Sequence, residues 1–148
     1  EVKPLVIYYS QTGSTVRVAE AMAAALEADL ATADAVSDSQ LAGRPLIGLG
    51  SGIYYMKHPA IVYALADRLP AGSRVFIFTT SGVKLKQFVR FYQSRLRRRL
   101  VRAGVEVLGE WHCPGYDQQA LLKPLGINRG RPDRADCEAA ATFARGLR

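Results

Sequence analysis

The stretch Val6-Ile7-Tyr8-Tyr9-Ser10-Gln11-Thr12-Gly13-Ser14-Thr15 decides the fold, and it runs directly into Val16-Arg17-Val18-Ala19-Glu20-Ala21-Met22. A short apolar run ends in hydroxyl residues and a glycine, and a helical pattern begins without a gap. This order places backbone N–H groups and hydroxyls at a helix N-terminus, where the helix dipole favours an anion, usually phosphate. The same residues could instead serve only as a helix cap, with Ser14 or Thr15 as the capping residue.

Strand and helix patterns alternate along the rest of the chain. Strands are expected at 30–36, 45–50, 74–79 and 105–111, and helices over 16–26, from Pro59 to Leu69, from Leu85 to Leu100 and from Asp133 onward. The strand at 30–36 is alanine-rich and weak, and 37–43 reads as a connector with at most one helical turn.

This alternation predicts an α/β fold with right-handed crossovers and a parallel sheet covered by helices on both faces. Five strands with a phosphate loop after the first fit a flavodoxin-like three-layer sandwich of strand order 2-1-3-4-5. The ligand of such a sheet binds beyond the carboxyl ends of the strands. The loops after strands one, three and four should therefore meet at one edge.

All three of these loops have the composition of ligand loops. Gly50-Ser51-Gly52-Ile53-Tyr54-Tyr55 and Thr79-Thr80-Ser81-Gly82-Val83 combine glycines and hydroxyls with apolar residues. Such loops allow backbone amides to approach a planar heterocycle, with Ile53, Tyr54 or Val83 covering its faces.

The chain resembles the flavodoxin superfamily from end to end, within the short-chain flavodoxin family proteins. The most specific motif is Ser10-Gln11-Thr12-Gly13-Ser14-Thr15, which is similar to the flavodoxin phosphate loop and lacks the lysine of a Walker loop. This resemblance implies FMN as the cofactor. It places the phosphate on Ser10, Gln11, Thr12, Gly13, Ser14 and Thr15, and the isoalloxazine ring between Ser51, Gly52, Ile53 and Tyr54 on one side and Thr80, Ser81, Gly82 and Val83 on the other.

Composition indicates a single globular domain over residues 1–148, because the chain is 49% hydrophobic and has one domain's length. No apolar run approaches the length of a membrane span, and Glu1-Val2-Lys3-Pro4 is not a signal peptide. Cys113 and Cys137 lack the spacing of a metal or redox motif. Two reduced cysteines favour a cytoplasmic protein.

Positive charge is concentrated in the C-terminal half. Residues 1–70 carry five Lys and Arg against seven Asp and Glu, whereas residues 71–148 carry fifteen against six. The densest segment is Arg95-Leu96-Arg97-Arg98-Arg99-Leu100-Val101-Arg102. It can be a solvated helix face or a docking surface for an acidic redox partner. Binding of nucleic acid or membrane is the least favoured reading, since the apolar stripe of this helix is committed to the core.

The basic charge also departs from the family pattern, because classical flavodoxins are strongly acidic. The loops after strands three and four lack Asp and Glu, and Lys57, Lys84 and Lys86 flank them. Such surroundings should favour anionic reduced flavin and raise the potential of the second reduction step.

Three functions remain open from the sequence. The first is an FMN-binding redox protein that carries electrons between partner proteins. The second is an FMN-dependent oxidoreductase that acts on a quinone or a porphyrinogen-type molecule, like the protoporphyrinogen dehydrogenases, although their specialised insertion is not evident. The third is an interaction module that has lost FMN, against which the intact phosphate loop argues.

The sequence assigns no residue a catalytic role. His112 and Cys113 follow the fifth expected strand at the active edge, and they are interpreted as half-buried bystanders rather than catalytic groups. His58 is interpreted as a solvated helix-start residue, and Tyr116 and Asp117 as either substrate-binding residues or parts of a turn. No metal site is expected.

Overall fold

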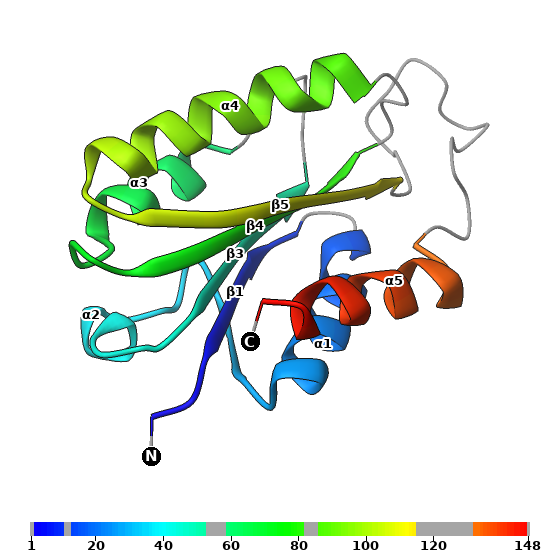
Figure 1. Cartoon of the computed structure of the whole chain (residues 1–148), viewed down its shortest axis with the longest axis horizontal. Helices are drawn as coiled ribbons and strands as arrows, with labels where there is room; N and C mark the ends of the chain where they lie inside the picture. The colour runs from blue at the N-terminus through cyan, green and yellow to red at the C-terminus, as the bar shows by residue number, and fades with distance from the viewer. Residues whose placement is uncertain (1, 11–12, 53–58, 82–85, 115–131, 148) are drawn as a thin grey trace.

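The five strands form one parallel sheet in the order β2-β1-β3-β4-β5, which confirms the expected topology (Figure 1). The structure, a computed structural model, describes residues 2–10, 13–52, 59–81, 86–114 and 132–147. The strands are β1 (Leu5–Tyr9), β2 (Asp29–Thr32), β3 (Ile47–Gly52), β4 (Arg74–Ser81) and β5 (Glu106–Pro114). The helices are α1 (Ser14–Leu26), α2 (Asp38–Leu41), α3 (Ala60–Arg68), α4 (Lys86–Arg102) and α5 (Arg134–Arg145).

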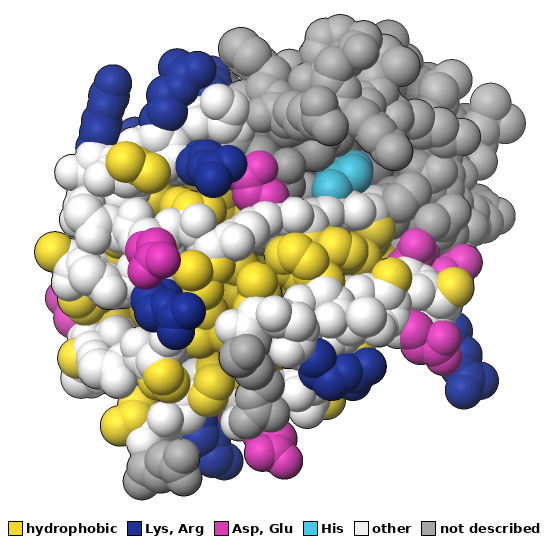
Figure 2. All heavy atoms as spheres, viewed as in Figure 1, with side chains coloured by type: hydrophobic (Ala, Val, Ile, Leu, Met, Phe, Trp, Pro, Cys, Tyr) yellow, Lys and Arg dark blue, Asp and Glu magenta, His cyan; other side chains and the backbone are white. Residues whose placement is uncertain are grey.

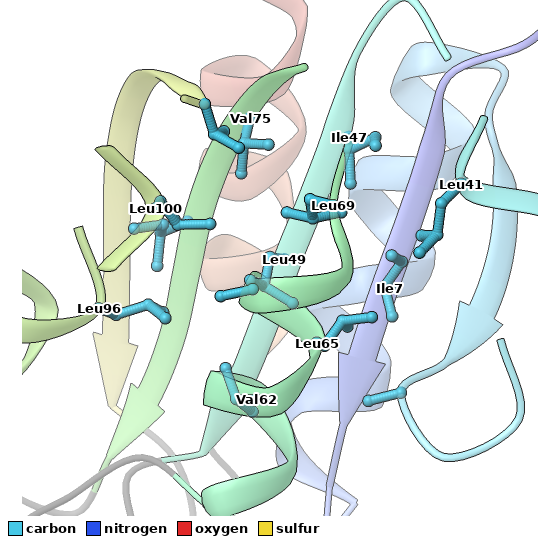
Figure 3. Close-up of a cluster of buried hydrophobic side chains, with 14 of the residues drawn as sticks. Ile7, Leu41, Ile47, Leu49, Val62, Leu65, Leu69, Val75, Leu96 and Leu100 are labelled. Atoms are coloured by element: carbon cyan, nitrogen blue, oxygen red, sulfur yellow. The ribbon is translucent and has the colours of Figure 1, made fainter. Parts of the chain in front are cut away.

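Helices cover both faces of the sheet, with α3 and α4 on one face and α1 and α5 on the other (Figure 1). The face under α3 and α4 is filled by aliphatic side chains (Figure 3) that include Ile7, Leu49, Leu65, Leu96 and Leu100. The opposite face is built from a second cluster, in which α1 and α5 pack on Phe76 and Phe78. The sheet is therefore buried on both faces, as expected for parallel strands with apolar runs.

Glycines in β3 make room for the aromatic side chains of β4. A Cβ atom on Gly48 would lie 2.4 Å from the Phe76 ring, and one on Gly50 would lie 2.1 Å from the Phe78 ring. Both distances are far below van der Waals contact, so any larger residue at these positions would displace a core phenylalanine.

The second strand is shorter than the 30–36 segment expected from the sequence. It ends at Thr32, because the N–H groups of Ala35 and Val36 both donate to the Thr32 carbonyl and turn the chain. Ala33 and Val36 are nevertheless buried, and this burial produced the apolar pattern of a longer strand. The segment 37–43 contains the expected helical turn, α2, which is closed by a capping box between Ser37 and Gln40.

Strands β4 and β5 are longer than expected at their carboxyl ends. They add Thr80 and Ser81 to β4 and residues 112–114 to β5. A β-bulge at Val75/Phe76 shifts the register between the two strands, so that Thr79 lies opposite His112 and Thr80 opposite Cys113. This extension carries polar side chains to the edge where the ligand loops leave the sheet.

Candidate functional site

The carboxyl ends of β1, β3 and β4 meet at one edge of the sheet, as the strand order requires. Tyr9 pairs with Ser51, and Gly52 pairs with Thr80. Ser10 follows directly after β1, so Ser10, Ser51, Gly52, Thr80 and Ser81 share this edge. The structure thus brings together residues from all three expected ligand loops.

The start of α1 has the backbone geometry of an anion-binding site. Gly13 is the N-cap residue, with φ 87° and ψ −8° in the left-handed region, and no side chain caps this helix. A Cβ atom at Gly13 would meet nothing within 4 Å. The Gly13 N–H donates to Oγ of Ser10 over 2.9 Å, so the last described residue before the loop is bonded to the first residue after it. No acidic residue stands in the first turn.

Two of the other helices begin with a side-chain cap. The helices α2 and α5 both begin with a capping box, formed in α5 by Asp133 and Asp136. The helices α1 and α3 have no side-chain cap. They follow β1 and β3, the two neighbouring strands between which the strand order reverses direction and where ligands of such sheets bind. The sequence expectation that Ser14 or Thr15 caps α1 is wrong, because Gly13 takes that position and no side chain makes the cap.

Thr15 connects the start of α1 to the end of β4. Its Oγ1 atom is hydrogen-bonded to Oγ1 of Thr80 over 2.9 Å, and both residues are buried, at 0% and 3% exposure. The two loops that were expected to hold the phosphate and the ring are therefore joined by a direct side-chain contact. Ser14 and Ser51 are also buried, at 4% and 1% exposure.

His112 lies on the opposite face of β4 from this contact. Its Nδ1 atom is hydrogen-bonded to Oγ1 of Thr79 over 2.9 Å. Burial lowers the pKa of His112 to about 4, although a hydrogen bond from the imidazole to the Thr79 backbone carbonyl opposes this shift. The imidazole is therefore neutral at pH 7. This pair was not predicted from the sequence, where the only signal for it is the position of both residues at the ends of expected strands.

Several expected site residues fall outside the described part of the chain. These are Gln11, Thr12, Ile53, Tyr54, Gly82 and Val83, together with Tyr55, Lys57, His58, Lys84, Tyr116 and Asp117. Cys113 is described and is buried at 3% exposure on the face of α1 and α5, rather than half-buried as expected. Among the described residues, no group of His, Cys, Asp or Glu could hold a metal ion.

The basic segment of α4 lies on the outside of the molecule. Arg99 makes two hydrogen bonds to Asp67 of α3, at 2.6 and 3.0 Å, and lies 5.5 Å from the centre of the Tyr63 ring. The remaining arginines of the segment are exposed, and Lys and Arg side chains gather over the C-terminal half of α4 (Figure 2). The apolar Leu96 and Leu100 are fully buried, as expected.

These features fit a phosphate-bearing ligand. A glycine in the left-handed conformation with open space beside it lets a ligand reach the first N–H groups of α1, and the helix dipole favours its negative charge. Within the described ranges, no helix has the length and apolar character to cross a membrane.

Comparisons with known proteins agree with this geometry. A family model described as a flavodoxin domain matches residues 5–117. An uncharacterized protein of Methanocaldococcus jannaschii is 32% identical over 98% of this chain and 97% of its own length.

Solved structures give the same fold at low sequence identity. Oxidised flavodoxin 2 from Bacillus cereus has a TM-score of 0.73 and 20% identity, covering 99% of this chain and 97% of that one. The rubredoxin oxygen:oxidoreductase from Desulfovibrio gigas has a TM-score of 0.68 and 17% identity, covering 98% of this chain but only 36% of that one.

Proposed function

Because the chain belongs to the flavodoxin family, we propose that it binds FMN at the carboxyl edge of its sheet and carries electrons between partner proteins. The observation that carries this proposal is the uncapped start of α1, where Gly13 leaves the first turn open to an anion. When bound, FMN supplies the redox chemistry, and the protein supplies its position and electrostatic surroundings. We propose that one domain over residues 1–148, in the cytoplasm, performs this role.

The assignment of binding residues is part of the proposal. Phosphate is assigned to Ser10, Gln11, Thr12, Gly13, Ser14 and Thr15, and the isoalloxazine ring to Ser51, Gly52, Ile53, Tyr54, Thr80, Ser81, Gly82 and Val83. Support comes from the shared edge of the described members and from the hydrogen bond between Thr15 and Thr80. The N–H groups of the α1 start bind phosphate, and the buried hydroxyls hold the two loops together.

Titration of the folded apo-protein with FMN, followed by flavin fluorescence, tests this function. Riboflavin is the matched ligand, because it has the same ring system and no phosphate. We expect stoichiometric FMN binding and binding of riboflavin that is at least about tenfold weaker. A folded chain that binds neither flavin contradicts the proposal and favours an interaction module.

We place the docking site for an acidic redox partner on the Arg95–Arg102 segment of α4. Arg95 and Arg98 are exposed, and among the described residues neither has an acidic partner, whereas Arg99 is paired with Asp67. Opposite charge speeds the encounter of two proteins. Since α4 begins at the carboxyl edge and is 17 residues long, Arg95 lies closer to the proposed flavin site than Arg102.

Charge reversal tests this surface. We expect Arg95→Glu with Arg98→Glu to slow electron transfer to an acidic carrier about tenfold at low salt, with the difference vanishing at high salt. The control is Arg134→Glu with Arg145→Glu, an equal change at two exposed arginines on α5. Equal rates in all variants would contradict docking at α4.

The second candidate is an FMN-dependent oxidoreductase that acts on a quinone or a porphyrinogen-type molecule. The likeness to part of the Desulfovibrio gigas rubredoxin oxygen:oxidoreductase supports only its general class, since a domain of this fold occurs in that longer oxidoreductase. Steady-state turnover with a quinone or a porphyrinogen as sole substrate separates the two candidates. A carrier protein should reduce these molecules slowly and without saturation.

The basic surroundings lead to a further expectation for the bound flavin. Positive charge favours the anionic reduced form, so the second reduction step should have a higher potential than in acidic flavodoxins. Separate midpoint potentials for the two one-electron steps test this, and a very low second potential would count against it.

A further inference from the structure

The end of β4 is held from both faces of the sheet by two consecutive threonines. Thr79 is hydrogen-bonded to His112 of β5, and Thr80 is hydrogen-bonded to Thr15 of α1, each over 2.9 Å. Successive side chains of a strand point to opposite faces, so one strand end can make both contacts at once. Thr15, Thr79 and Thr80 are all buried, at 0%, 0% and 3% exposure, whereas His112 is partly buried, so water is kept from the Thr15–Thr80 bond and reaches the other bond only from the His112 side.

The position of His112 depends on the β-bulge between β4 and β5. The register pairs Val75 with Val107 before the bulge and Phe76 with Gly109 after it, so one extra residue is inserted into β5. This insertion brings His112 opposite Thr79, where Trp111 would otherwise stand. Bulges of this kind re-aim side chains next to functional sites.

His112 makes this contact as a neutral group. Burial lowers its pKa to about 4. On the same face, among the described residues, the charged groups include Glu110, two residues earlier on β5, and Arg97 of α4, whose Nη1 atom lies 3.8 Å from Oε1 of Glu110. This Oε1 atom is buried and accepts no hydrogen bond from a described residue. Because the imidazole is uncharged, its bond to the Thr79 hydroxyl does not depend on titration near pH 7.

The two contacts link three elements of the proposed flavin site. Thr80 and Ser81 end β4 and lead directly into the loop assigned to the isoalloxazine ring, while Thr15 stands in the first turn after the loop assigned to phosphate. A strand end that is fixed on both faces holds Thr80 and Ser81, the described residues assigned to the ring, in a defined position. A shift of Thr79 would also move Thr80 and its contact with α1.

We propose that His112 is a positioning residue for the flavin site, acting through Thr79 on the end of β4. This inference rests on the proposed function for its effect on FMN, but its effect on β4 concerns the chain alone. His112 is assigned no contact with FMN and no proton transfer.

Three variants test the inference. His112→Leu and Thr79→Val each remove one partner of the hydrogen bond, and Thr79→Val does so with almost no change of shape. His112→Asn is the matched control, because its side-chain amide can occupy the place of Nδ1 and keep a bond to Thr79. Two readouts are needed: hydrogen exchange of the Thr80 and Ser81 amides in the apo-protein, and the FMN dissociation constant with both midpoint potentials.

We expect faster exchange at Thr80 and Ser81 in both disruptive variants, together with FMN binding weakened about tenfold, a size typical of one lost hydrogen bond. The double variant should bind FMN no more weakly than His112→Leu alone, because the side-chain bond that Thr79→Val removes is already absent in it. His112→Asn should stay within about threefold of the unmodified chain. If His112→Leu fails to fold, Thr79→Val carries the test.

Unchanged exchange, affinity and potentials in Thr79→Val would overturn the inference. A His112→Asn protein as impaired as His112→Leu would do the same, since it would show that the ring itself and not the hydrogen bond matters. An unmodified chain that does not bind FMN contradicts the proposed function instead, and the exchange measurement in the apo-protein then still decides the positioning role.

Discussion

The starts of α1 and α5 are close neighbours, but the chain closes them in opposite ways. Arg17 in the first turn of α1 donates to the Pro132 carbonyl over 2.9 Å, just before the start of α5. At α5, Asp133 and Asp136 form a reciprocal capping box with two bonds of 2.9 Å. At α1, Gly13 stands in the same position without a capping side chain.

This difference separates a helix start that is closed by its own side chains from the one at which we propose that the ligand binds. A carboxylate at the N-cap satisfies the free N–H groups and also occupies the place where an anion would bind. A glycine in the left-handed conformation leaves these groups open and lets a ligand approach. The account therefore predicts that changes at α1 alter flavin binding, whereas changes at α5 alter stability.

The largest expected effect comes from closing α1 with a charge. Gly13→Asp should weaken FMN binding by about 100-fold, close to 3 kcal/mol, because a carboxylate would stand where the phosphate is bound. Gly13→Asn is the control, since asparagine tolerates the left-handed region and carries no charge. Calorimetric titration measures both variants. Equal affinities for the two would show that charge at this position does not matter and would break the comparison.

The second effect is a dependence of folding stability on pH that comes from His112, next to the proposed flavin site. The pKa of His112 is about 4 in the folded chain, against 6.5 for an unperturbed histidine. The unfolded chain therefore binds the extra proton between these values, and stability falls as the pH is lowered from 6.5 to 4. The loss should be on the order of 1–2 kcal/mol after allowance for the partial exposure of the ring.

Urea unfolding across this pH range measures that loss. His112→Asn should remove most of the slope between pH 6.5 and 4, whereas Asp133→Asn, on the α5 side, should leave it in place. An unchanged slope in His112→Asn would show that the loss belongs to other groups.

The third effect is the removal of the cap on α5. Asp133→Ala should lower the free energy of unfolding by about 1 kcal/mol, because the N-cap acceptor and its partner bond are lost. Its affinity for FMN should remain within about twofold of the unmodified chain. Asp133→Asn keeps an acceptor and should retain most of the stability. A large loss of FMN affinity in Asp133→Ala would mean that the two helix starts are not functionally separate.

The smallest effect is the response of the apo-protein to free phosphate. Millimolar phosphate should raise its thermal stability slightly relative to chloride at equal ionic strength, because an anion that binds only the folded chain stabilises it. The increase should disappear in Gly13→Asp and persist in Asp133→Ala. Equal stabilisation in both variants would point to a general salt effect.

Most of the fold could be predicted from the sequence. Apolar runs alternate with helical patterns, and a parallel sheet with right-handed crossovers leaves few possible strand orders. The exception is the second strand. Ala33 and Val36 are buried, but they lie in the turn that follows the strand. A pattern of apolar residues indicates which positions are buried, and it does not distinguish a buried turn from a buried strand.

The site could be predicted only in part. Gly13 was identified because glycine has a specific backbone role, but the contact of Thr79 with His112 was not. That contact depends on a bulge that shifts the register by one residue, and no hydrophobic pattern encodes such a shift. Thr80 and His112 also extend their strands with polar residues, which the apolar pattern assigned to loops.

The most direct test of the account is an FMN titration of the isotope-labelled protein followed by amide NMR. The account predicts saturable shifts at Ser10 and Gly13–Thr15, at one FMN per chain, with no comparable change at Asp133–Cys137. Shifts that centre on the start of α5, or a folded chain whose spectrum does not respond to FMN, would contradict it.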